Sequence, residues 1–146
     1  MITECAAICA WLADAFPDAG LAPALAERGA YYRWMFFAAG PVEQAVMARF
    51  LGFEPDRKQQ MTLGFGSFEH VMDTLESAVL ESDYLAGDHF SAADVYVGSH
   101  IGWGLQFGTV DKRPAFEEYW ARVSGRTAYR TASKLDDEAM SDGTGA

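Results

Sequence analysis

Two cysteines near the start of the chain are the residues best suited to chemistry. Cys5 and Cys9 lie four residues apart in ITECAAICAWLAD, residues 2–14. A thiol at a helix N-terminus can have a lowered pKa and act as a nucleophile, but nothing beside the pair suggests an activating base, and we assign no catalytic residue. No histidine pattern accompanies the two thiols, so we expect no metal. Cys9 is interpreted as a small apolar residue of the core.

A second stretch carries histidine and aspartate in GDHFSAADVYVG, residues 87–98. His89 and Asp94 allow a catalytic interpretation, but helix capping explains the same residues more simply. Ser91 is suited to cap the N-terminus of a helix, and Asp94, three residues later, is placed to accept a hydrogen bond from the backbone amide of Ser91. The sequence therefore predicts a structural capping box formed by Ser91 and Asp94. His100 has no partner that suggests a triad or a metal site.

Composition limits the partners of the chain. With 146 residues it is expected to form one principal domain with a proper core. Its formal net charge of −10 argues against nucleic acids and anionic membranes, which attract basic surfaces. The N-terminus has none of the features of a secretory signal, because no lysine or arginine precedes Arg28. A small molecule or another protein is the expected partner, in the reducing cytoplasm.

The elements that must position these residues are helices. Apolar residues recur at three- and four-residue spacing, and no β-type alternation of useful length is present. The pattern predicts an all-α protein. Helices are expected within 2–14 with Thr3 as N-cap, about 24–51 with a kink at Pro41, about 65–80, 92–107, 115–123 and 127–134, followed by an acidic tail.

The helix over 92–107 is expected to be the buried centre of the bundle. It carries three glycines, Gly98, Gly102 and Gly104, which are unfavourable in a helix interior. No strand precedes them, so a phosphate-binding loop is not indicated. We interpret them as positions where a neighbouring helix packs closely.

Four segments of the chain together resemble the glutathione S-transferase family. Three of them match helical segments of the family: the first long helix, the capping stretch with the residues before it, and the late helix. The opening segment matches a motif at the end of the family's thioredoxin-like domain. In chain order the segments are ITECAAI (2–8), RWMFFAAGPVEQAV (33–46), YLAGDHFSAAD (84–94) and RPAFEEYWARVSGRTAY (113–129). The resemblance covers roughly residues 2–132.

The resemblance implies a domain organisation and a ligand. Residues 1–16 would be the last helix of a thioredoxin-like domain, 17–135 a helical C-terminal domain of this family, and 136–146 a disordered acidic tail. A Glu-Ser pair that holds the γ-glutamyl end of the co-substrate glutathione maps onto Glu4 and Cys5. The family's thiol-activating Tyr, Ser or Cys has no counterpart here, since most of the N-terminal domain is absent from the matched segments.

By the same resemblance, aromatic residues of the first long helix would form the pocket for the electrophile. Tyr31, Trp34 and Met35 are the favoured members. Core packing is the alternative for each of them, because so dense an aromatic cluster must bury some of its members whatever the function.

Two functions follow from the resemblance. In the first, the chain is the C-terminal portion of a detoxifying glutathione transferase whose full-length form conjugates glutathione to electrophiles, while this chain alone is inactive. In the second, it is a stand-alone, non-catalytic helical binding or dimerisation module. In both cases Ile8, Trp11 and Leu12 are expected to leave apolar surface uncovered. This surface predicts a homodimer, or alternatively a first helix that detaches and frays.

Overall fold

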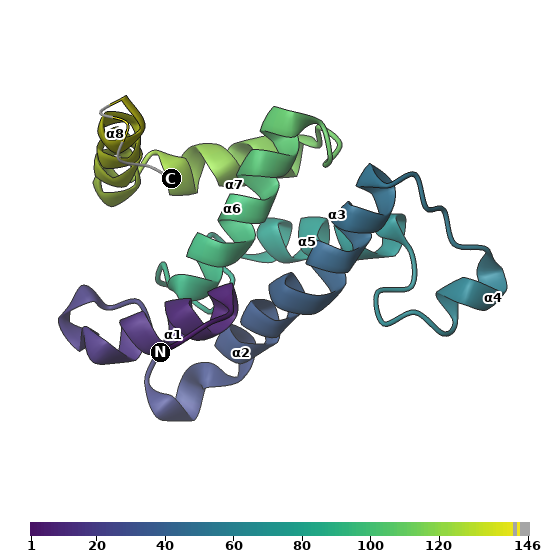
Figure 1. The fold of residues 1–146 in the computed structure, drawn as a ribbon. Coiled ribbons are helices and arrows are strands. Elements are labelled where there is room, and N and C mark those ends of the chain that lie inside the picture. Colours follow the sequence, from purple (N-terminus) through teal and green to yellow (C-terminus); the bar gives the residue numbers. More distant parts are fainter. Residues whose placement is uncertain (142, 144–146) are drawn as a thin grey trace.

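A computed structural model describes residues 1–141 and 143, and these form a helical bundle (Figure 1). Within the described residues there is no strand, so the predicted all-α class is confirmed. The α-helices are α1 (Cys5–Ala15), α2 (Arg28–Phe37), α3 (Glu43–Phe50), α4 (Arg57–Gln60), α5 (Phe68–Glu81), α6 (Ala92–Phe107), α7 (Pro114–Ser124) and α8 (Thr127–Ser141). Two 3₁₀ turns (Pro17–Ala19 and Leu25–Glu27) and a π-turn (Ala38–Val42) complete the chain.

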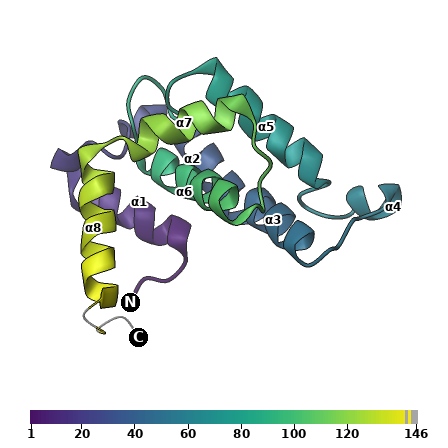
Figure 2. The same ribbon diagram turned by 90° about the horizontal axis from the view of Figure 1, so that it is seen from above.

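Helix α6 is the centre of the bundle, as the sequence predicted. It contacts α1 and α2 on one side and α7 on the other, while α5 packs against α7 and α3. Figure 2 shows α5 and α7 side by side, with α4 and α8 at opposite ends of the molecule. Buried residues occur along most of α6 and none occur on α8, so the core is built around α6. No described helix is long and apolar enough to cross a membrane.

The predicted capping box starts α6 and also ties it to two other parts of the fold. The carboxylate of Asp94 is fully buried and accepts hydrogen bonds from the amide of Ser91 (2.9 Å) and its hydroxyl (3.0 Å). It also accepts from the amide of Leu85 (2.9 Å) and from the hydroxyl of Tyr119 on α7 (2.9 Å). Burial raises the pKa of Tyr119, and the neighbouring carboxylate raises it further. One side chain therefore links the preceding turn, α6 and α7.

Two of the three glycines of α6, Gly98 and Gly102, let a neighbouring helix pack closely, as predicted. A Cβ atom at Gly98 would lie 3.1 Å from Cγ2 of Val123, and one at Gly102 would lie 2.5 Å from the indole of Trp120. Both neighbours are on α7, so α7 approaches the α6 backbone itself. A Cβ atom at Gly104 would clash with Val110, in the segment between α6 and α7.

Gly104→Ala is therefore expected to destabilise the protein by about 1–3 kcal/mol, the usual range for overpacking a core. Gly29→Ala on α2 is the matched control, because a Cβ atom there meets nothing within 4 Å. The control lies in the first turn of α2, so it should gain less than the roughly 1 kcal/mol expected in a helix interior. Urea unfolding of both variants checks this, and a stabilising Gly104→Ala would show that the close approach at Val110 is not rigid.

The first long helix changes to a π-turn at Pro41, where the sequence predicted a kink. Instead of one helix over 24–51, the structure has α2, a π-turn containing Pro41, and α3. Proline has no amide hydrogen to donate and its ring collides with the preceding turn, so the helix widens locally. The interruption also lets α3 contact α5 while α2 contacts α6.

The last helix is longer than expected. It continues past Lys134 to Ser141, so residues 136–141 are helical where the sequence predicted a disordered tail. The segment contains good helix formers such as Leu135 and Glu138, and the Lys134 ammonium lies 3.6 Å from the Glu138 carboxylate one turn later. Local helix propensity therefore outweighs the acidic composition of this segment. Residues 142 and 144–146 of the predicted tail lie outside the described residues.

Candidate functional site

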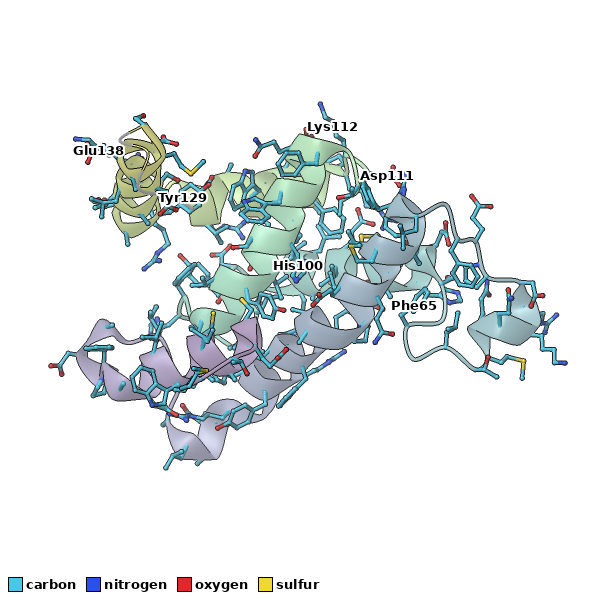
Figure 3. The ribbon with its side chains drawn as sticks, viewed as in Figure 1. Phe65, His100, Asp111, Lys112, Tyr129 and Glu138 are labelled. Carbon is cyan, nitrogen blue, oxygen red and sulfur yellow. The ribbon has the colours of Figure 1, made fainter. Side chains whose placement is uncertain are left out.

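A groove between α1, α3 and α6 brings together side chains that could take part in binding or catalysis. It encloses about 510 Å³ and combines the two cysteines of α1 with aromatic and apolar side chains. A second hollow of about 400 Å³ adjoins it at the N-terminus of α1, where Glu4 and Glu43 lie. The two hollows share Cys5, Tyr96 and His100, and we call them together the α1–α6 groove. His100 lies between α6 and α3 (Figure 3).

Glu4 holds an unusual backbone conformation at one end of this groove. Its φ of 69° and ψ of 122° make it the only non-glycine residue with positive φ among the described residues. Such a conformation costs about 1–3 kcal/mol and is concentrated at functional sites. The predicted N-cap Thr3 is wrong, because α1 begins at Cys5 with Glu4 in the cap position.

The first turn of α1 is open to a ligand. No side chain caps its free backbone amides. Unpaired amides and the helix dipole together favour an anion such as a carboxylate. The exposed carboxylate of Glu4 next to them favours a cation. A ligand that carries both an ammonium and a carboxylate group, like an amino acid, matches this pair.

The two thiols differ in their surroundings. Cys5 is exposed. Cys9 is half-buried and packs against the core, so the predicted buried position of Cys9 is partly reached. Burial raises the pKa of the Cys9 thiol to about 11, and the charge and hydrogen bond of Cys5 contribute to the shift. Cys9 is thus protonated at neutral pH and is a poor nucleophile. Within the described part of the chain no cluster of three potential ligands could hold a metal ion.

Burial shifts the pKa values of two polar groups deeper in the groove toward the uncharged form. Burial lowers the pKa of His100, a shift that Glu43 opposes, and its Nε2 atom is buried without a hydrogen-bond partner among the described residues. Burial likewise raises the pKa of Tyr96 to about 12. The hollow of about 510 Å³, which neither Glu4 nor Glu43 lines, therefore suits an apolar molecule that carries one or two polar atoms.

The predicted pocket residues lie elsewhere. Tyr31, Trp34 and Met35 are buried in the core and do not line the α1–α6 groove, which matches the alternative of core packing. Sequence reasoning missed the residues that line the groove instead. These are Met47 and Phe50 of α3 and Tyr96, His100, Trp103 and Phe107 of α6. Their only signal in the sequence is the pair Tyr96 and Trp103, seven residues apart on one face of α6.

Comparison with known proteins shows which folds the chain resembles. Neither a protein-family model nor a curated protein sequence matches the chain. Solved structures do match. The chain is 26% identical to a sphingomonad glutathione S-transferase complexed with glutathione, with a TM-score of 0.73 over 93% of this chain and 68% of that one. It is 26% identical to a glutathione transferase of Methylococcus capsulatus, with a TM-score of 0.74 and the same coverage.

A third structure, the beta-class glutathione S-transferase of Sphingomonas chungbukensis, is 25% identical, with a TM-score of 0.71 over 92% of this chain and 67% of that one. The chain spans about two thirds of the length of these proteins. The fold supports the resemblance that the four segments indicate. The chain is therefore similar to the bacterial glutathione S-transferases, over about two thirds of their length.

Proposed function

We propose that the chain forms the helical part of a glutathione transferase, an enzyme that joins glutathione to electrophilic small molecules. The observation that carries the proposal is the strained Glu4 at the open N-terminus of α1, directly beside an apolar groove. The similar sphingomonad protein is complexed with glutathione. A polar end site and an apolar site that share Cys5 are what a conjugation reaction needs, because its two substrates must meet.

The γ-glutamyl end of glutathione fits the N-terminus of α1. Its ammonium group would pair with the Glu4 carboxylate, and its carboxylate would accept from the free amides of the first turn. Cys5 occupies the position where the family resemblance expects serine, and a thiol is a weaker hydrogen-bond donor than a hydroxyl. Binding of this one end of a flexible tripeptide should therefore be weak.

The electrophile fits the deeper, apolar part of the groove. Its volume of about 510 Å³ lies within the range of about 300–1,000 Å³ typical of small-molecule pockets. Trp103 and Phe107 offer apolar faces to it. In the conjugation the glutathione thiolate attacks an electrophilic carbon, a bond to sulfur forms and the leaving group departs with its electron pair.

The chain by itself is expected to show no conjugation of glutathione to 1-chloro-2,4-dinitrobenzene above the uncatalysed rate. The resemblance assigns thiol activation to a residue outside the matched segments, and Cys9 is held protonated. The measurement is a spectrophotometric rate with repurified protein. Turnover that disappears in Cys5→Ser but survives in Cys9→Ser would contradict the assignment and make Cys5 the reactive group.

A homodimer is part of the proposal. Helix α1 is apolar on both faces: Ala6, Cys9 and Ala13 face the core, while Ile8 and Trp11 are exposed. A helix that is apolar all round is normally covered on both sides. A second copy of the chain would supply that cover, and two unpaired cysteines fit a reducing, cytoplasmic location.

The same exposed face supports a second function, a stand-alone helical binding or dimerisation module. The core around α6 is well packed without any further domain. The intact mass of the protein from its native source separates the two functions. A species of 16.0 kDa favours the module, and a substantially heavier species that contains this sequence favours the transferase.

A further inference from the structure

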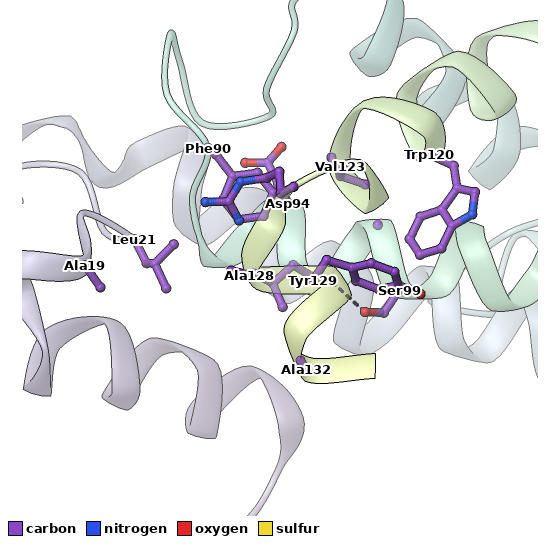
Figure 4. A pocket seen from close by; sticks show the side chains of 13 residues that line it. Ala19, Leu21, Phe90, Asp94, Ser99, Trp120, Val123, Ala128, Tyr129 and Ala132 are labelled. Carbon is purple, nitrogen blue, oxygen red and sulfur yellow. Dashed lines mark hydrogen bonds between the residues drawn. The ribbon is translucent and has the colours of Figure 1, made fainter. Parts of the chain in front are cut away.

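A second cavity lies on the other side of α6, between α6, α7, α8 and the segment that follows α1 (Figure 4). It encloses about 330 Å³, within the range of small-molecule sites. Val95 and Ser99 of α6 border both this cavity and the α1–α6 groove, so they form the ridge between the two. The cavity contains none of the residues assigned to glutathione or to the electrophile.

The walls of the cavity are aromatic and small. Trp120 of α7 and Tyr129 of α8 meet edge to face with ring centroids 5.2 Å apart, and Phe90 lies at another wall. Figure 4 shows Ala128 and Ala132 on the same side as Tyr129. Flat aromatic molecules stack well on such rings, and the alanines leave space for them.

One positive charge lines this apolar cavity. The guanidinium carbon of Arg126 lies 3.5 Å from the centroid of the Phe90 ring, which holds the side chain in place. Four other arginines pair with carboxylates: Arg28, Arg49, Arg113 and Arg122. Among the described residues, Arg126 has no carboxylate within 4.0 Å. Its planar donor groups are available for a ligand.

Asp94 also borders the cavity, but its carboxylate is committed to the fold. It accepts four hydrogen bonds, from Leu85, Ser91 (twice) and Tyr119, and is fully buried. Arg126 is half-buried and therefore the accessible charge of the site. An anion in contact with it would be partly shielded from water, which strengthens a charge-assisted hydrogen bond.

We propose that this cavity binds an aromatic carboxylate. The ring system would lie among Phe90, Trp120 and Tyr129, and the carboxylate would accept hydrogen bonds from the guanidinium of Arg126. The site is distinct from the proposed glutathione groove, so its occupancy does not depend on transferase activity.

Calorimetric titration of the complete chain with 2-naphthoate and with the neutral 2-naphthylmethanol tests the proposal. We expect one equivalent of 2-naphthoate to bind, about tenfold more tightly than the alcohol, because only the acid pairs with the guanidinium. Arg126→Gln should remove this preference. Arg130→Gln, one turn further along on exposed α8 surface, should retain it. Ala132→Phe, which fills the cavity, should abolish binding of both compounds.

Failure of 2-naphthoate to bind, or equal affinity for the acid and the alcohol, would overturn the proposal. So would an unchanged preference in Arg126→Gln. If the Arg126 variant has an altered melting temperature, two results still test the proposal. These are the relative affinity of the wild-type chain for the acid and the alcohol, and the loss of binding in Ala132→Phe.

Discussion

Asp94→Ala is expected to lower the melting temperature by about 10 °C. The change removes an acceptor of four hydrogen bonds from a fully buried position. The amides of Leu85 and Ser91 and the hydroxyl of Tyr119 would lose their partner, and each buried unpaired group costs about 1–3 kcal/mol. A total of roughly 3–5 kcal/mol corresponds to this shift in a domain of this size. Thermal unfolding followed by circular dichroism measures it.

Two variants control this experiment. Asp88→Ala removes an identical side chain from an exposed position in the same loop and should change stability by less than about 0.5 kcal/mol. Asp94→Asn keeps one acceptor oxygen and should fall between the wild type and Asp94→Ala. Equal melting temperatures for Asp88→Ala and Asp94→Ala would show that the carboxylate does not hold α6, α7 and the preceding turn together.

Trp11→Glu is expected to convert the proposed homodimer into a monomer. The outward face of α1 exposes 39% of Ile8, 52% of Trp11 and 43% of Leu12, as predicted from the sequence. Tyr32 and Phe36 of α2 add exposed aromatic surface next to it, since Arg28 links Asp14 of α1 with Tyr32. A charge buried at the centre of an apolar interface has no partner and carries a large desolvation penalty. Light scattering after size exclusion measures the change.

Met61→Glu is the matched control, because Met61 is exposed after α4 and far from α1 along the bundle. It should leave the dimer intact. A wild-type chain that frays at α1 instead would be monomeric, with rapid hydrogen exchange over residues 2–14. A monodisperse monomer of 16.0 kDa whose residues 2–14 are protected from exchange would contradict both outcomes.

The sequence was most informative where the signal is local. The capping box of Ser91 and Asp94 identified the start of α6, since cap, spacing and the following apolar run all agree. Pro41 identified the interruption between α2 and α3 for a similar reason. That Asp94 also accepts from Leu85 and Tyr119 could not be predicted, because those contacts depend on the packing of α7.

The candidate site was harder to predict. The aromatic cluster of α2 shows that some of its members are buried, but not which face meets a ligand, and Tyr31, Trp34 and Met35 lie in the core. Thr3 is a better local cap than Glu4, yet the chain places Glu4 there in a strained conformation. Local propensity predicts a relaxed backbone conformation at every residue. The strained conformation of Glu4 is therefore seen only in the structure.

A nuclear magnetic resonance titration with glutathione and S-hexylglutathione tests the proposed function most directly. Glutathione is expected to shift the amide signals of Glu4, Cys5 and Ala6 with millimolar affinity, about −4 kcal/mol. S-hexylglutathione should shift these and also the signals of Tyr96 and Trp103, because its apolar chain enters the groove. Glu4→Gly, which tolerates the same backbone conformation without the carboxylate, should weaken both. Shifts confined to other surfaces, or no shift with either ligand, would contradict the assignment of the α1–α6 groove to a glutathione transferase.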